Sequence, residues 1–378
     1  MLCYINILLN ANSYPGWKNR IEYFTKPGVA MCASPWENTM NPKIKKIIRA
    51  VALLVFLALG IKILSPHLES VPESIAALKQ LNYWALAVAV FFEFLRFMSC
   101  GYLINVIIGL FNDHVSSWDA TTIAMASSSF GMVAGGMVGS IASSAGWLRK
   151  KGVNLQAASM AGFLPILFNN LAVLILSLVG VIYLLGMDAL TKPQMNAFLV
   201  ILILLLSAFI LIFLFLKKRE KSKIAAIKII QWYTKTFKKP FDEEKSGQQL
   251  DEIFDMWDLF IQKGWKKPLL ASFMIYGFDL LALFFLFMAA NHPISPRILL
   301  IGYGLPQLLG KAAFVIPGGV GVVEGTMISL YQQLGISNPV AVVVVLSYRF
   351  LTFLLPAIIG FLLVVVLQRD DVSAKSPI

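Results

Sequence analysis

Apolar runs long enough to cross a lipid bilayer set the first limit on how this chain can fold. A transmembrane helix needs about 20 mainly apolar residues and satisfies its backbone hydrogen bonds internally. Runs of this kind lie at about 44–64, 83–110, 156–185, 196–216 and 268–290, and a last run begins near Asn338. We therefore predict an all-α, polytopic helical membrane protein with about six full spans.

The composition agrees with a membrane protein and excludes a soluble globule. Hydrophobic residues make up 58% of the chain and charged residues 14%, whereas a soluble domain carries roughly 25% charged residues. The net charge of +12 comes largely from lysines and arginines beside the apolar runs. Such clusters mark cytoplasmic ends and meet anionic inner-leaflet lipids, so we expect no nucleic-acid partner. We predict a multi-pass protein of the cell inner (cytoplasmic) membrane with both termini in the cytoplasm.

The metal-binding residue types are sparse and scattered. The three cysteines and three histidines are Cys3, Cys32, Cys100, His67, His114 and His292. None of them has the paired spacing of a metal site. We predict neither a metal nor a cofactor.

Two membrane halves follow an N-terminal segment of different character. Residues 1–39 contain scattered aromatics and Pro-Gly pairs, and we interpret them as a disordered or mis-called extension. Residues 40–195 form the first predicted half and residues 196–378 the second. The second half includes 217–267, a cytoplasmic loop with amphipathic helices that begins KKREKSK.

The stretch from Ile316 to Pro356 breaks the pattern of an ordinary membrane helix. Pro317, Gly318 and Gly319 interrupt an apolar segment, because proline removes a hydrogen-bond donor and glycine loosens the backbone. The apolar residues that follow carry Glu324, and the next run carries Arg349. Charged groups at membrane depth cost about 2.5–3.5 kcal/mol each on insertion scales, so they face a protein interior or a wet cavity.

The same pattern occurs earlier in the chain. The pairs Gly135-Gly136 and Gly318-Gly319 are 183 positions apart, as are Gly152 and Gly335. The first motif ends in the basic run WLRKK, whereas the second ends without positive charge. We predict two re-entrant Gly-Gly hairpins in two inverted-topology halves, about eight membrane segments in all. In the alternative, each Gly-Gly segment is a full span.

Other ionisable residues lie inside the predicted spans. Glu93 and Arg96 are three residues apart on one helix face and can pair. Asp279 occupies nearly the position in the second half that Glu93 occupies in the first. We assign these three residues to charge pairing or gating. They could also simply neutralise one another in a packed bundle.

Three motifs in the second half point to a known family. The segments PGGVGVVEG, LGIS and SYRFLTFLLPAIIG resemble the flippase-like transmembrane region of the lysylphosphatidylglycerol synthase family. The resemblance covers about residues 44–368. It implies a stand-alone membrane module, without the aminoacyl-transferase domain, that acts on membrane lipid.

We therefore expect a flippase-like translocator of an anionic phospholipid or lipid-linked envelope precursor. Arg349 and Lys311 would meet the phosphate, Glu324 would balance the charge of the empty site, and the unwound backbone at Gly318, Gly319 and Gly321 would expose amides to the headgroup. In a purely structural alternative, Glu324 and Arg349 fix the helix register as a buried pair.

Two other classes of function stay open, and an ordinary enzyme does not fit. The chain could be a non-catalytic accessory subunit of an envelope enzyme that modifies lipid or glycan. It could also be an intramembrane lipid-modifying enzyme with Glu324 as the base. We expect no enzyme, because G-x-S-x-G and H-E-x-x-H are absent and the Gly-Lys-Ala at 310–312 lacks P-loop spacing.

Overall fold

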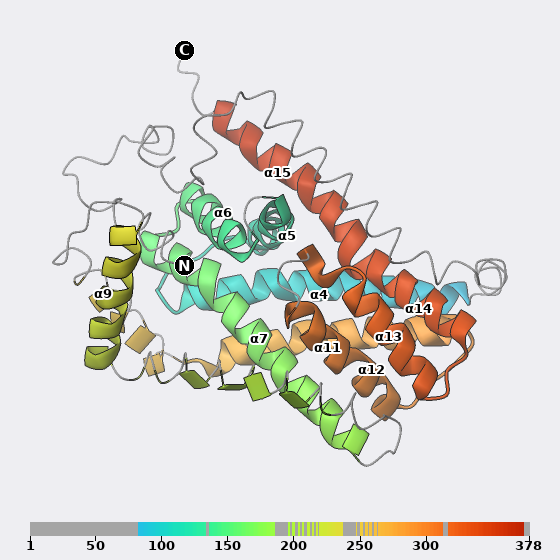
Figure 1. Cartoon of the computed structure of the whole chain (residues 1–378). Coiled ribbons are helices and arrows are strands. Elements are labelled where there is room, and N and C mark those ends of the chain that lie inside the picture. Colours follow the sequence, from blue (N-terminus) through green and yellow to red (C-terminus); the bar gives the residue numbers. More distant parts are fainter. Residues whose placement is uncertain are drawn as a thin grey trace. The chain divides into compact units, whose positions relative to one another are not determined.

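The structure is a computed structural model that describes residues 82–133, 136–185, 219–236, 264–312 and 317–373, with single positions between 196 and 262. Regular structure is entirely helical in these described parts (Figure 1). The helix α9 (Arg219–Thr236) belongs to one compact unit of the chain, and the other helices belong to a second. The boundary near residue 195 and the extension 1–39 remain predictions.

Four helices of the second unit are long and apolar enough to cross a membrane. They are α4 (Tyr83–Gly109), α7 (Leu155–Leu185), α11 (Lys266–Ala289) and the continuous run of α14 (Asn338–Arg349), η6 (Phe350–Leu354) and α15 (Leu355–Ser373). They confirm four predicted spans and the multi-pass class. The predicted span 44–64 and much of 196–216 lie outside the described residues.

Shorter helices lie between these long ones. They are α5 (Ser117–Val133), α6 (Met137–Lys150), α12 (Pro296–Ala312) and α13 (Val322–Gln333). The longest has 17 residues, fewer than the roughly 20 that a full span needs. The helix α5 packs on α6, and α12 packs on α13. This is the form expected of hairpins, and their re-entry into the membrane remains a prediction.

The predicted glycine breaks fall between the arms of each pair. Gly136 has a φ of +66° between α5 and α6, and its N–H donates to the Gly131 carbonyl at 2.7 Å. The short helix η5 (Pro317–Gly319) separates α12 from α13, with φ values of +67° at Gly318 and +60° at Gly319. Side chains are strained at such angles, so glycine is required there. Gly135 lies outside the described residues.

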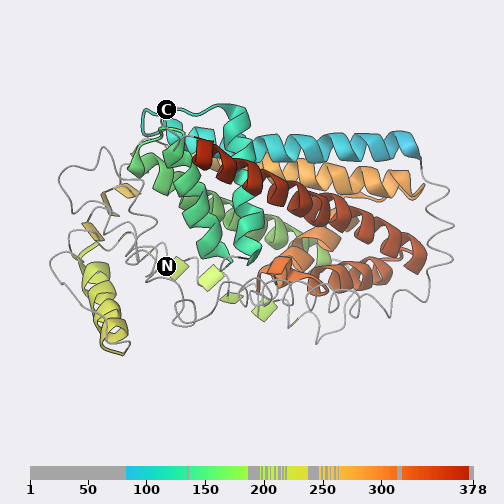
Figure 2. The ribbon, with the colours of Figure 1, turned by 90° about the horizontal axis from the view of Figure 1, so that it is seen from above.

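The order long, short, short, long occurs twice, and the two helices that begin each series, α4 and α11, run in opposite directions. The N–H of Asn82, before α4, donates to the carbonyl of Ala289, at the end of α11, at 2.8 Å. The start of one helix therefore lies at the end of the other, and the two lie side by side along their length (Figure 2). Antiparallel equivalents are what two inverted halves produce.

Each half also packs its closing long helix against the other half. The helix α7 lies on α12, and α15 lies on α5. Small residues make both contacts close: a Cβ on Gly304 would lie 2.8 Å from the Cα of Ser177, and one on Gly360 would lie 2.7 Å from the Met125 carbonyl oxygen. Small residues let helices approach in lipid, where apolar surface alone gives little attraction. The helices α4 to α7 and the helices α11 to α15 are thus in contact through α7 and α15 as well as through α4 and α11.

The described part of residues 217–267 confirms one predicted helix. The helix α9 carries Arg219 and Lys223 near its start, and both pair with Asp251, at 3.2 and 2.5 Å. Trp232 and Ile224 on the same helix are largely exposed. Its predicted place on the inner leaflet remains a prediction.

Candidate functional site

Two groups of residues, each gathered around buried charged side chains, lie in the second unit. The first, called here the hairpin site, consists of Gly318, Gly321, Glu324, Arg349 and Phe353. The second, called here the carboxylate network, consists of Glu93, Arg96, Asp279, Tyr303 and Tyr348.

At the hairpin site, Arg349 holds both sides of the broken segment. Its Nε donates to Glu324 Oε1 at 2.6 Å, and its Nη2 donates to the Gly318 carbonyl at 2.8 Å. Glu324 is 5% exposed and Arg349 is 9% exposed. One guanidinium therefore ties the last long span to α13 and to the loop that precedes it.

The first turn of α13 explains the position of Glu324. Gly321 precedes the helix, and its N–H donates to Glu324 Oε2 at 2.6 Å. A glutamate three residues into a helix commonly accepts this bond, and the positive end of the helix dipole favours its charge. Glu324 thus takes the place that an external anion would otherwise occupy at a helix N-terminus.

Close packing fixes the loop around Gly318. The ring of Phe353 lies under the guanidinium, with its centroid 4.8 Å from Arg349 Cζ. A Cβ on Gly318 would lie 2.1 Å from an atom of that ring, and a Cβ on Gly319 would lie 2.7 Å from the Cα of Gly310. The break is therefore held between α12 and η6, with no room for a side chain on either glycine.

Lys311, the other predicted phosphate ligand, has a separate partner. Its Nζ donates to Asn170 Oδ1 on α7 at 2.8 Å, and both residues are exposed. It follows Gly310, which touches the loop at Gly319. The structure therefore places Lys311 beside the hairpin site but bonds it to α7 rather than to the Glu324–Arg349 pair.

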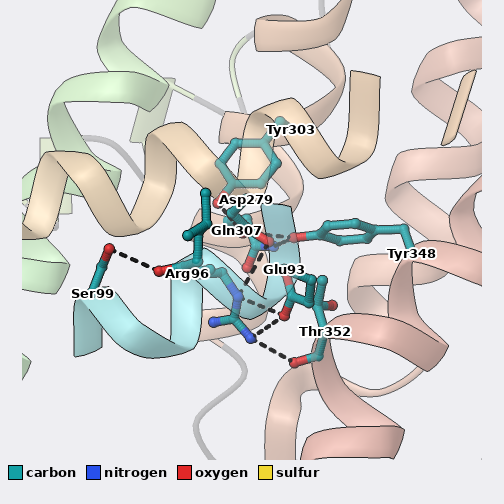
Figure 3. A network of polar contacts seen from close by, with 9 residues as sticks. Glu93, Arg96, Ser99, Asp279, Tyr303, Gln307, Tyr348 and Thr352 are labelled. Atoms are coloured by element: carbon teal, nitrogen blue, oxygen red, sulfur yellow. Dashed lines mark hydrogen bonds and ion pairs between the residues drawn. The ribbon is translucent and has the colours of Figure 1, made fainter. Parts of the chain in front are cut away.

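The carboxylate network brings the other predicted residues together between α4 and α11 (Figure 3). Arg96 donates to Glu93 Oε1 from Nε at 2.6 Å and lies 2.5 Å from it at Nη2, which confirms the predicted pairing. Its Nε also lies 3.8 Å from Asp279 Oδ1. Arg96 thus lies close to two carboxylates, Glu93 on α4 and Asp279 on α11.

The sequence analysis missed the two tyrosines of the network. The hydroxyls of Tyr303 and Tyr348 both donate to Asp279 Oδ2, at 2.5 and 2.9 Å, and Gln307 Nε2 donates to the Tyr348 hydroxyl at 3.1 Å. Figure 3 shows Asp279 between them. Tyr348 belongs to the Tyr-Arg motif quoted above, but nothing in the apolar run around Tyr303 singled it out.

One turn of helix joins the two sets of residues. Tyr348 faces the carboxylate network, and its neighbour Arg349 faces the hairpin site. Arg96 Nη2 donates to the Thr352 carbonyl at 3.3 Å, inside the π-helix η6. A π-helical turn inside an α-helix often marks a functional site. Arg96 and Tyr348 therefore connect the network to the segment that carries Arg349.

No metal site arises from these groups. In the part of the chain with described coordinates, no three His, Cys, Asp or Glu side chains gather as metal ligands would. The chemistry available at both sets is the binding of an anion by a guanidinium and the exchange of a proton on a carboxylate.

Comparisons with known proteins agree with the predicted family. The sequence model of the lysylphosphatidylglycerol synthase transmembrane region matches residues 47–360. A UPF0104 membrane protein of Methanocaldococcus jannaschii is 29% identical over 133 residues, 34% of this chain and 39% of that relative. Another, of Pyrococcus horikoshii, is 26% identical over 235 residues, 58% of this chain and 70% of that relative.

Proposed function

The chain belongs to the family of the lysylphosphatidylglycerol synthase transmembrane region, and we propose that it translocates an anionic lipid. The substrate is an anionic phospholipid or a lipid-linked envelope precursor, and the membrane is the cytoplasmic one. The protein acts as a transporter rather than an enzyme. Its two halves have inverted topology, its Gly-Gly segments are re-entrant, and both termini lie in the cytoplasm.

The observation that carries the proposal is a buried arginine whose counter-ion belongs to the protein itself. A guanidinium binds carboxylate and phosphate through the same planar fork of donors. In the structure, Glu324 accepts from one donor of that fork, Nε, at 2.6 Å, and the Gly318 carbonyl accepts from another, Nη2, at 2.8 Å. A phosphate headgroup fits the same donors, so it competes with Glu324 for Arg349. When the headgroup leaves, Glu324 pairs with Arg349 again, so the buried guanidinium is not left without a counter-charge.

The broken backbone beside Arg349 supports the same role. The N–H of Gly321 now donates to Glu324 at the start of α13. Displacement of Glu324 frees this donor at a helix N-terminus, where phosphate groups bind well. The exposed amine of Lys311 reaches the headgroup by exchanging Asn170 for a phosphate oxygen. Broken helices of this kind bind substrates in secondary transporters.

The interlocked halves supply the motion that translocation needs. Antiparallel equivalents allow one site to open to either side of the membrane in turn. Because α7 packs on α12 and α15 packs on α5, movement of one half shifts a hairpin arm of the other. Alternating access then follows as one half rocks against the other.

The test is lipid movement by the purified protein in vesicles that contain a headgroup-labelled anionic phospholipid. We expect the protein to move this lipid between leaflets and Arg349→Gln to abolish the movement. Arg297→Gln is the matched control, since Arg297 is an exposed cation on α12 outside both sets. Full movement by folded Arg349→Gln would remove this residue as the phosphate contact.

The same assay separates the other classes of function. An accessory subunit would move no lipid alone and would co-purify with an envelope enzyme. A lipid-modifying enzyme would change the mass of the labelled lipid. Either result would overturn the proposal.

A further inference from the structure

The carboxylate network holds one more negative charge than positive charge. Glu93 and Asp279 are carboxylates with 5% and 7% side-chain exposure, and Arg96 is the one cation of the network. A buried charge without a counter-charge is expensive, and more so at membrane depth. Some further positive species therefore belongs to this site.

The groups around Glu93 supply no second cation among the described residues. The helix α7 has no charged residue, and Asp119, the one charge on α5, pairs with Lys151 at 2.7 Å. The titratable groups in and around the network come from α4, α11, α12 and α14 and are Glu93, Arg96, Cys100, Tyr276, Asp279, Tyr303 and Tyr348.

The hydrogen bonds distinguish the two carboxylates. Asp279 Oδ2 accepts two tyrosine hydroxyls, and Glu93 Oε1 accepts Arg96. Glu93 Oε2 is buried and has no hydrogen-bond partner, and Asp279 Oδ1 has only its 3.8 Å approach to Arg96. Asp279 Oδ2 already accepts two hydroxyl hydrogens. Glu93 Oε2 is the oxygen free to carry a hydrogen atom.

We infer that Glu93 binds one exchangeable proton and that this proton drives the lipid translocation proposed above. A hydronium ion on one side of the membrane breaks one of its O–H bonds as a new O–H bond forms at Glu93 Oε2, which leaves a water molecule and makes the network neutral. After the protein reopens, the proton leaves to water on the other side. No other bond forms or breaks.

The path to the lipid site runs through η6. A charged Glu93 attracts Arg96 more strongly than a neutral one, which weakens the bond from Arg96 to the Thr352 carbonyl. Thr352 lies three residues beyond Arg349 and next to Phe353, which underlies the guanidinium. Protonation of Glu93 thus changes the helical turn that positions the phosphate contact. This part of the inference rests on the proposed function.

The first measurement detects the proton without lipid transport. Infrared difference spectra of the whole protein in vesicles are compared between about pH 5 and about pH 9, a range that brackets the perturbed carboxyls of buried sites. We expect a carbonyl band of a protonated carboxylic acid that is missing in Glu93→Gln and kept in Asp119→Asn. Glu93→Gln resembles the protonated side chain in shape and charge, so it keeps the fold. Persistence of the band in Glu93→Gln would overturn the assignment.

The second measurement detects whether proton movement across the membrane is coupled to lipid movement. With one proton per lipid, a pH difference of one unit drives the labelled lipid to a leaflet ratio of about tenfold. We expect this ratio for the unchanged protein and for Asp119→Asn, and a ratio near one for Glu93→Gln. A response to a sodium gradient at fixed pH, or a pH-driven ratio in Glu93→Gln, would overturn the inference. If the unchanged protein moves no lipid, the proposed function fails, while the infrared band still reports the proton.

Discussion

The Glu324–Arg349 pair allows the structural and the functional role of one contact to be separated. The three variants are Glu324→Gln, Arg349→Gln and the double change. Each single change leaves one charge buried without its partner, whereas the double change leaves two neutral amides of similar size. Arg297→Gln is again the control.

The expected free energies follow from the contacts. Arg349 makes two bonds, at 2.6 Å to Glu324 and at 2.8 Å to Gly318, and hydrogen bonds to charged groups contribute about 1.5–3 kcal/mol each. Removing one partner of a buried pair costs about 3–5 kcal/mol. We expect each single variant to lose about 3 kcal/mol of unfolding free energy. The double variant should lose no more than either single one, a coupling energy of about 3 kcal/mol.

The assay measures unfolding free energy in mixed micelles and lipid movement in vesicles on the same preparations. We expect the double variant to lose no more stability than either single variant and yet to move no lipid, because the phosphate contact is gone. If the double variant recovers both stability and lipid movement, the pair is only a structural lock and the reasoning fails. If the single losses simply add, the pair is not the coupled contact described here.

Three further outcomes follow from the described residues. Gly318→Ala should lower the free energy of unfolding by at least about 1–2 kcal/mol, because the φ of Gly318 is +67° and an added Cβ would meet the ring of Phe353. Gly325→Ala is the control, since an added Cβ there would meet no atom within 4 Å, and it should not lower the free energy of unfolding. Backbone N–H groups of Asn154 and His114 hold the pKa of the Asp113 carboxyl below its ordinary value, so its contribution to stability is present above about pH 3.8 and is lost as the pH falls through the lowered pKa. Asp113→Asn should remove that acid dependence from melting curves, and an unchanged dependence would contradict it. In a cysteine-free background, single cysteines should react with an impermeant thiol reagent from outside at two of four positions, and labelling at 150 would refute the inverted hairpins. The two expected inside are 150 and 218, and the two expected outside are 292 and 333.

Most of the architecture could be predicted from local sequence signals. Long apolar runs gave α4, α7 and α11 within a few residues, because spanning helices have a fixed minimum length. The glycine break at Gly318 was predictable too, since few residues besides glycine adopt its φ. The spacing of Glu93 and Arg96 predicted their pairing, because three residues bring side chains onto one helix face.

The cross-chain partners were not predictable from the sequence. Tyr303 and Asp279 are 24 residues apart, and only the packing of α12 against α11 brings them together. Asn170 meets Lys311 across 141 positions. No local sequence pattern predicts the π-helical turn at Phe350–Leu354 either, because its apolar residues would also suit an ordinary helix.

A lipid phosphate that takes the place of Glu324 on Arg349 must compete with that carboxylate. Native mass spectrometry measures this competition as the amount of anionic phospholipid that the purified protein retains. Competition predicts opposite changes: Glu324→Gln should retain more lipid than the unchanged protein, and Arg349→Gln should retain less. Equal retention by both variants, or losses in the same direction, would contradict the claim.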